Sequence, residues 1–155
     1  MTEQRSYTYT TLRYVHDVRT GEFLNVGVVL HAASLGRLEF KTCKTFGRAK
    51  RMFPDLDGDA LHDAMRAVDH VLAAHARQPA EATPLAGDGN ALSIARQALS
   101  ADDSTLQWSE LGSGVSNDLT KALDRLYARM VTRYDTDTHV AEIEDEVRAH
   151  ERRRA

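Results

Sequence analysis

Several features typical of secreted and membrane proteins are missing from this sequence of 155 residues. Its single cysteine, Cys43, excludes an intramolecular disulfide and leaves no second thiol for a zinc site built on cysteine pairs. No apolar run approaches the roughly 20 residues that a membrane-spanning helix needs. The polar stretch from Met1 to Ser6 is not followed by the hydrophobic segment of a signal peptide. We therefore expect a cytoplasmic protein that does not enter a membrane.

The sequence also lacks an excess of positive charge. Its 20 lysines and arginines face 23 aspartates and glutamates, which gives a formal net charge of -3. The whole molecule therefore has no basic excess to draw it to phosphate backbones, and a nucleic-acid function would need a local basic patch. Charged residues make up 28% and hydrophobic residues 42%, which is typical of a folded chain. A chain of this length favours one core, so we expect a single domain over residues 1–155.

The first third of the chain has the pattern of an antiparallel sheet. The stretch from Tyr7 to Tyr14 is rich in threonine, tyrosine and leucine, which favour strands. After a charged turn, apolar side chains alternate from Leu24 to Leu30 with the period of two that a strand requires. Residues 37–42 alternate between charged and mainly apolar side chains. This third predicted strand should have one face in water.

The period changes after the third predicted strand. Leu61, Met65, Val68 and Leu72 recur at the three- and four-residue spacing of an amphipathic helix. The later predicted elements are a surface loop over 78–90, a short helix over 92–99, a short strand over 106–111, a helix to Tyr134 capped by Ser116 or Asn117, and a helical segment over 139–154. The expected fold class is α+β, with a small antiparallel sheet from the N-terminal third packed by helices from the remainder.

The predicted hairpin between the first two strands holds the most suggestive group of polar residues. A hairpin would bring together Arg13, Asp17, Arg19, Glu22 and Asn25 at one end of the sheet. Two carboxylates beside two guanidiniums can bind a phosphate, position a metal or perform general acid and base chemistry. Asp17 and Glu22 are thus the catalytic candidates. The alternative is a charged turn with local ion pairs, each contributing less than about 1 kcal/mol.

A second candidate is a row of basic residues on the last strongly predicted helix. Lys121, Arg125, Arg129 and Arg133 recur every four residues, and we call this row the basic ridge. Like charges at that spacing repel one another, so an acidic partner is expected. The partner can be the acidic run at 142–146 in the same chain, another protein, or the phosphates of a nucleic acid.

Other polar groups give weaker indications. A Gly112-Ser113-Gly114 segment before a helix has the layout of an anion site, but it lacks the lysine and glycine spacing of a phosphate loop. His62, His70 and His75 share one predicted helix without the i, i+4 spacing that lets two imidazoles bind one metal. The remaining histidines are His16, His31, His139 and His150. We find no catalytic triad, and we expect neither a metal nor a cofactor.

Three short runs carry a resemblance to a known family. They are Arg13-Tyr14-Val15-His16-Asp17, Thr20-Gly21-Glu22-Phe23-Leu24-Asn25-Val26-Gly27-Val28-Val29-Leu30, and Phe53-Pro54-Asp55-Leu56. With them the chain resembles a bacterial family known as domain-of-unknown-function family 3037 (DUF3037). The resemblance spans roughly Tyr7 to Leu72 and returns loosely around Leu119 to Val131.

Two positions depart from that family's pattern, with His16 in place of the usual proline and Thr20 in place of the usual arginine. These departures weaken the case for an active site in the hairpin turn. The resemblance implies a genomic context and no activity. Similar proteins are often encoded beside kinases that look like HipA, the toxin kinase of a bacterial toxin and antitoxin pair. An accessory or regulatory partner of such a kinase is what the resemblance suggests.

Three functions remain open from the sequence. The leading hypothesis is a non-catalytic interaction module with a protein partner, because the sequence offers a charged hairpin and a basic ridge but no assembled catalytic group. The first alternative is an enzyme for a phosphorylated or nucleotide substrate, with Asp17 and Glu22 in the catalytic roles and Arg13 and Arg19 as clamps. The second is nucleic-acid binding through the basic ridge, which the net acidity disfavours. A homo-oligomer is compatible with all three.

Overall fold

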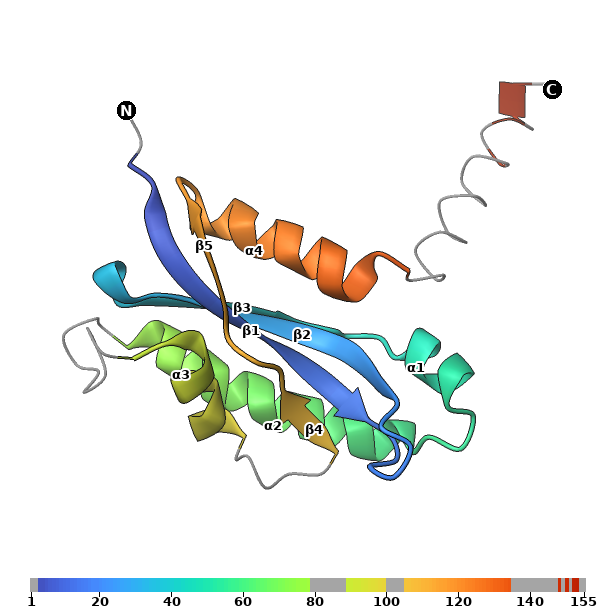
Figure 1. Cartoon of the computed structure of the whole chain (residues 1–155). Helices are drawn as coiled ribbons and strands as arrows, with labels where there is room; N and C mark the ends of the chain where they lie inside the picture. Colours follow the sequence, from blue (N-terminus) through green and yellow to red (C-terminus); the bar gives the residue numbers. More distant parts are fainter. Residues whose placement is uncertain are drawn as a thin grey trace.

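The computed structural model describes residues 3–78, 89–99 and 105–134, together with positions 148, 150, 152 and 153. Its sheet is antiparallel, with the strand order β3-β2-β1-β4, and β5 pairs with the remaining part of β1 (Figure 1). The strands are β1 (Arg5–Val15), β2 (Phe23–Ala32), β3 (Arg37–Thr42), β4 (Leu106–Trp108) and β5 (Gly112–Ser116). The three strands predicted from the first third are confirmed, and so is the α+β class.

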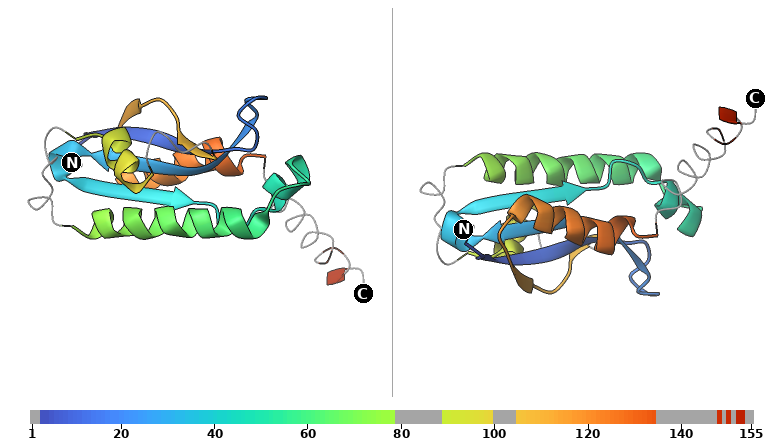
Figure 2. Two further views of the ribbon diagram at one scale, coloured as in Figure 1. Left: turned by 90° about the horizontal axis from the view of Figure 1, so that it is seen from below. Right: turned by 90° about the horizontal axis from the view of Figure 1, so that it is seen from above.

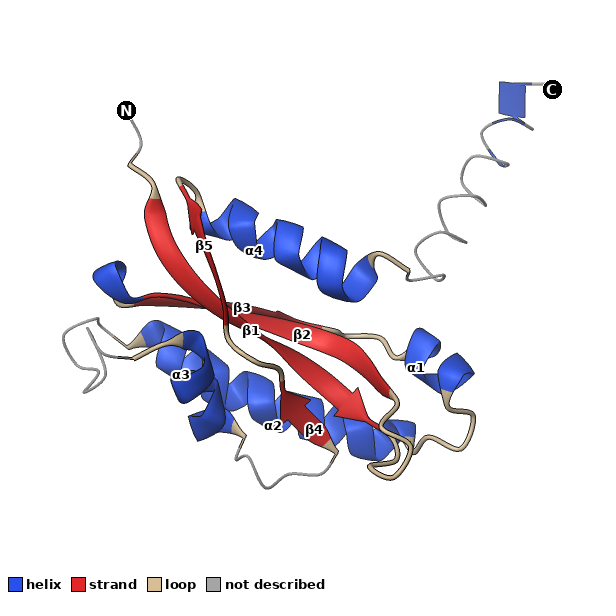
Figure 3. Ribbon diagram, in the orientation of Figure 1, coloured by secondary structure: helices blue, strands red, loops and turns tan. Residues whose placement is uncertain are grey.

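Helices cover both faces of this sheet. The helical elements are η1 (Ala33–Leu35), α1 (Gly47–Met52), α2 (Gly58–Arg77), α3 (Ala91–Ala98), α4 (Leu119–Tyr127) and the π-helical turn η3 (Ala128–Thr132) that continues α4. Helices α2 and α3 lie on one face and α4 lies on the other (Figure 3). None of the helices among the described residues is both long and apolar enough to cross a bilayer.

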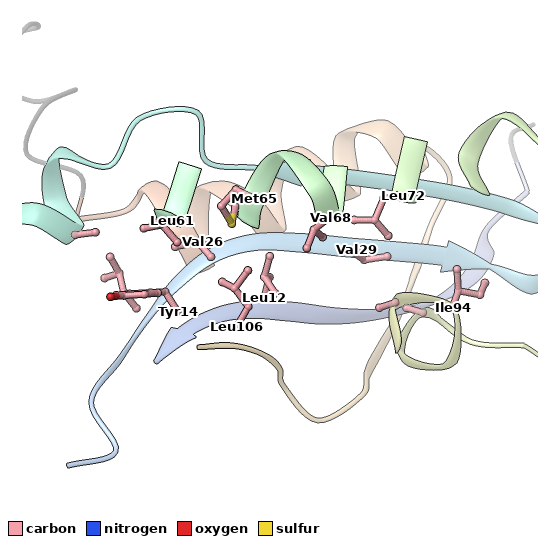
Figure 4. Close-up of a cluster of buried hydrophobic side chains, with 14 of the residues drawn as sticks. Leu12, Tyr14, Val26, Val29, Leu61, Met65, Val68, Leu72, Ile94 and Leu106 are labelled. Atoms are coloured by element: carbon pink, nitrogen blue, oxygen red, sulfur yellow. The ribbon is translucent and has the colours of Figure 1, made fainter. Parts of the chain in front are cut away.

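The larger core lies between the sheet and helices α2 and α3 (Figure 4). Helix α2 buries the four residues whose spacing predicted it, Leu61, Met65, Val68 and Leu72. It begins after Asp57, whose carboxylate accepts a hydrogen bond from the backbone N–H of Ala60 at 3.1 Å and so satisfies one of the free amides of the first turn.

The smaller core lies under α4, where Leu119, Leu123 and Leu126 pack with Val28 and Leu30 of β2. The N-cap of α4 differs from the prediction. Asp118 caps the helix by accepting the backbone N–H of Lys121 at 3.1 Å. Ser116 ends β5, and its hydroxyl bonds the backbone of Asp118 instead.

The Gly112-Ser113-Gly114 segment is part of β5 and does not form the loop leading into a helix that the sequence suggested. Gly112 and Gly114 pair with Tyr9 and Tyr7 of β1. A Cβ atom on Gly112 would overlap the Tyr9 ring, and one on Gly114 would lie 2.5 Å from the hydroxyl oxygen of Tyr7. The glycines therefore let two tyrosine rings of β1 lie across the edge strand.

The outer face of β3 is only partly open to water, unlike the prediction. Arg37 and Lys41 are exposed, but the side chain of Glu39 is largely covered. The reason is that α4 lies beside this strand, and the hydroxyl of Thr120 donates to Oε1 of Glu39 at 3.0 Å. Most of the predicted loop at 78–90 and of the helical segment at 139–154 lies outside the described residues. The single-domain organisation stays a prediction.

Candidate functional site

The turn between β1 and β2 is organised by Asp17. Its carboxylate accepts the backbone N–H of Arg19 at 2.8 Å and the Nε–H of the same residue at 3.4 Å. Its carbonyl accepts the hydroxyl of Thr20 and the backbone N–H of Gly21, whose φ of 73° is in the left-handed region that favours glycine. Glu22 lies at the exposed end of the turn. Asp17 and Arg19 thus form a local pair of the kind found in solvated turns.

Arg13 and Asn25 lie in the strands that flank the turn, and each contacts a partner outside it. The guanidinium carbon of Arg13 lies 4.3 Å from the centroid of the Phe23 ring, which is a cation–π contact. The Nδ2 group of Asn25 donates to the carbonyl of Met130 at 3.0 Å, and Nη1 of Arg48 donates to the carbonyl of Val131 at 3.1 Å. Carbonyls in the last turn of a helix lack partners within the helix. Asn25 therefore ties β2 to the end of η3.

The side chains of the hairpin residues consequently do not converge on one site. Asp17 bonds Arg19 within the turn, Arg13 contacts Phe23, and Asn25 bonds the backbone of η3. Across the described part of the chain, no group of three or more histidine, cysteine, aspartate or glutamate side chains could hold a metal. The catalytic roles of Asp17 and Glu22 stay a prediction.

Four side chains form a cluster that joins two segments far apart in the sequence. The hydroxyl of Tyr14 lies 2.6 Å from Nδ1 of His16, and Nε2 of His16 lies 2.8 Å from Oδ1 of Asp55. The His16 ring is stacked on Phe53 with 4.4 Å between centroids and 11° between planes. Tyr14 and Phe53 meet edge to face.

The protonation of this cluster follows from its chemistry. Burial of Tyr14, followed by the nearby charge of Asp55, raises the pKa of the phenol, so Tyr14 keeps its proton at neutral pH. With Tyr14 donating to Nδ1, the Nε2–H of His16 donates to Asp55, and both ring nitrogens of His16 have a partner. The Tyr14 side chain is buried and its hydroxyl is hydrogen-bonded. The Tyr14–His16–Asp55 series of hydrogen bonds therefore joins β1 to the connection between α1 and α2.

The basic ridge lies on the exposed surface of α4 and η3. All four of its residues are exposed, and the charges among the described residues include no ion-pair partner for any of them. Helix α4 turns Thr120, Asp124 and Tyr127 toward β3. Because successive helical residues rotate by about 100°, Arg125 and Arg129 lie on the other flank, the one toward β1. The acidic run at 142–146 lies outside the described residues.

A comparison with protein families decides the classification. The family described as Protein of unknown function (DUF3037) matches residues 9–131. The chain belongs to the DUF3037 family. This confirms the resemblance and extends it, since the match also includes α3, β4 and β5. Comparisons with curated proteins and with solved structures find no match.

The extent of the DUF3037 match has a structural reason. Strands β4 and β5 both pair with β1, so the sheet is incomplete without the segment after Leu72. Two of the runs that carried the resemblance also meet in space, because Tyr14 and His16 contact Phe53 and Asp55.

Sequence reasoning missed this tyrosine–histidine–aspartate series in the DUF3037 chain. One local signal was present: residues two apart in a strand lie on the same face, and this rule places Tyr14 beside His16. No sequence signal reaches Asp55, which is 39 positions further along the chain. His31 was also missed, and the structure buries it near the start of β1.

Replacing His16 with alanine should lower the free energy of unfolding of this DUF3037 protein by about 1–2 kcal/mol, because the buried phenol loses its acceptor and Phe53 loses its stacked partner. Urea denaturation of the variant against the parent chain measures the loss. His70→Ala is the matched control, since His70 is exposed on α2 and should change stability by less than about 0.5 kcal/mol. Equal stability of the two variants would show that the series does not tie β1 to Asp55.

Proposed function

We propose that this protein is a non-catalytic interaction module that binds an acidic surface of a partner protein through the basic ridge. The observation that carries the proposal is the contrast between the ridge cations and the cations of β3. On β3, Arg37 pairs with Glu39 at 2.7 Å and Lys41 pairs with Asp124 at 3.4 Å. The ridge cations have no such partner among the described residues, and their spacing makes them repel one another. An acidic surface would remove that repulsion.

Exposed aromatic side chains beside the ridge support a protein partner. Tyr134 is 65% exposed, and the guanidinium of Arg133 lies 5.3 Å from the centroid of its ring. Phe23 is 42% exposed beneath Arg13. Asn25 lies on the same face of β2 as Phe23 and bonds the end of η3. The Arg13–Phe23 pair therefore adjoins the end of the ridge. Arginine and aromatic residues are the types enriched at the centres of protein interfaces.

The charge of the chain favours a protein partner over a nucleic acid. A net charge of -3 opposes binding to a phosphate backbone, whereas an acidic patch on a folded protein needs only local complementarity. The family resemblance suggests a first partner to test, a HipA-like kinase encoded beside the gene.

The test is co-expression with that neighbouring kinase, followed by purification and measurement of the affinity. We expect a stable complex, and Arg125→Glu with Arg129→Glu should weaken it by about a hundredfold. The control reverses the same number of charges on α2, with Arg66→Glu and Arg77→Glu, and should leave the affinity within about threefold of the parent.

Two results would contradict the proposal. One is the absence of a complex at micromolar concentrations of both proteins. The other is equal weakening by the ridge variant and the α2 variant, which would show that net charge alone drives association. If a DNA or RNA fragment is bound in a ridge-dependent way and the kinase is not, nucleic-acid binding replaces this proposal.

A further inference from the structure

A pocket of about 420 Å³ lies at the end of the sheet opposite the β1–β2 turn. Its lining comes from the start of β1, the end of β2, η1, β5 and the residues just before α3. The strand pairing places Thr8 opposite both His31 and Ser113, and Ser6 opposite Val115. These side chains therefore share the face of the sheet that α2 and α3 cover elsewhere. In both views of Figure 2, β5 forms the outer margin of the sheet beside this region.

His31 is the unusual member of this lining. Its side chain is only 4% exposed, and its Nδ1 atom is buried without a hydrogen-bond partner among the described atoms. Burial lowers the pKa of the imidazole, while a hydrogen bond to the backbone of Gly89 acts in the opposite direction and raises it. The ring is therefore neutral at neutral pH. A backbone bond that raises the pKa is one in which the ring donates, so Nδ1 is left as an unoccupied acceptor.

The rest of the lining does not supply the missing donor. The hydroxyl of Thr8 donates to the carbonyl of His31 at 3.5 Å and accepts the backbone N–H of Ala91 at 2.9 Å, at the first turn of α3. Besides His31, the lining among the described residues contains Tyr7, Val115, hydroxyl-bearing and small side chains, and no lysine, arginine, aspartate or glutamate. A buried acceptor without a partner is uncommon in folded proteins and calls for an explanation.

We propose that this pocket binds an uncharged, largely apolar group, such as a phenol, which donates one hydrogen bond to Nδ1 of His31. The volume is within the range of small-molecule sites. An anion is disfavoured because the described lining residues include no lysine or arginine, and a single imidazole without a second ligand among them does not hold a metal. The donor can belong to a free metabolite or to a tyrosine-like side chain of another molecule, and the chemistry of recognition is the same.

The test compares p-cresol with 4-methylanisole on the whole protein by NMR titration. The two probes share the aromatic body, and only p-cresol has a hydroxyl to donate. We expect p-cresol to bind in the millimolar range, to shift the Nδ1 signal of His31, and to bind about tenfold more tightly than 4-methylanisole. Equal affinities, or no shift at His31 with either probe, would overturn the proposal.

Three variants check that the site is this pocket. His31→Phe keeps a ring but removes the acceptor, so it should reduce p-cresol affinity to that of 4-methylanisole. His70→Phe is the matched control on the exposed side of α2 and should change neither affinity. Ser113→Phe adds bulk to the lining from the exposed edge strand and should abolish binding of both probes. If Ser113→Phe binds both probes as the parent does, the pocket is not the site.

A further arm separates the two sources of the donor. N-acetyltyrosine methylamide presents the same phenol on a peptide backbone. Binding at least as tight as that of p-cresol supports a side chain of another molecule, and loss of binding supports a free small molecule. The pocket is distinct from the basic ridge, so a failure of either proposal leaves the other standing.

Discussion

Replacing Leu12 with alanine should lower the free energy of unfolding by about 2–5 kcal/mol, the largest loss of stability that we expect from a single substitution. Leu12 is fully buried in the centre of β1, between Gly27 of β2 and Trp108 of β4. Its side chain packs in the core under α2 (Figure 4). The strands on both sides hold β1 in place, so the cavity left by the truncation cannot close easily.

Urea denaturation at a fixed temperature measures this loss. Leu35→Ala is the matched control, because Leu35 is 39% exposed in η1 and its truncation should cost less than about 1 kcal/mol. A loss at Leu12 no larger than the loss at Leu35 would contradict the central position of β1 between β2 and β4.

The second large effect is expected at Asn25. Replacing it with leucine keeps a similar volume but removes the donor to the carbonyl of Met130, leaving that carbonyl unpaired. The expected loss of stability is about 1–3 kcal/mol. Since the bond joins β2 to η3, the change should also loosen the part of the basic ridge that holds Arg129.

The free energy of unfolding and hydrogen exchange together check this prediction. Hydrogen exchange of the backbone amides over 128–134 should become faster in Asn25→Leu, while exchange in α2 should not change. Asn117→Leu is the control with the same chemical change at an exposed position before α4, and it should leave both stability and exchange unaltered. Unchanged exchange over 128–134 in Asn25→Leu would show that Asn25 does not secure this turn.

The sheet and the long helix could be predicted because their patterns are local. Alternation from Leu24 to Leu30 specified β2, and the spacing from Leu61 to Leu72 specified α2. The spacing in α2 reflects which face of the helix is buried, so a single segment contains that information. Strand β2 is buried on both faces, and a register shift opposite Leu12 and Arg13 places Val26 in the core under α2 but Val28 and Leu30 in the core under α4.

The remaining features depend on contacts between distant segments. Gly112 and Gly114 had the local pattern of a loop, yet they belong to a strand that pairs with β1. These positions are glycine because the rings of Tyr9 and Tyr7 occupy the space that a side chain would need. The charge pattern of the hairpin suggested a common site, but Asn25 bonds a carbonyl 105 positions away. For the candidate ridge, the sequence provided the spacing of the four cations and the structure provided their exposure. Sequence periodicity cannot supply such long-range partners.

The central claim is that the basic ridge binds an acidic surface of a partner protein, and the salt dependence of the affinity tests it most directly. The affinity for a HipA-like kinase, the partner proposed above, would be measured over a series of salt concentrations, for the parent chain and for Arg125→Glu with Arg129→Glu. We predict that the parent affinity falls steeply as salt rises, because salt screens exposed charges, and that the ridge variant shows a much shallower dependence. The same steep slope for both proteins would contradict the claim.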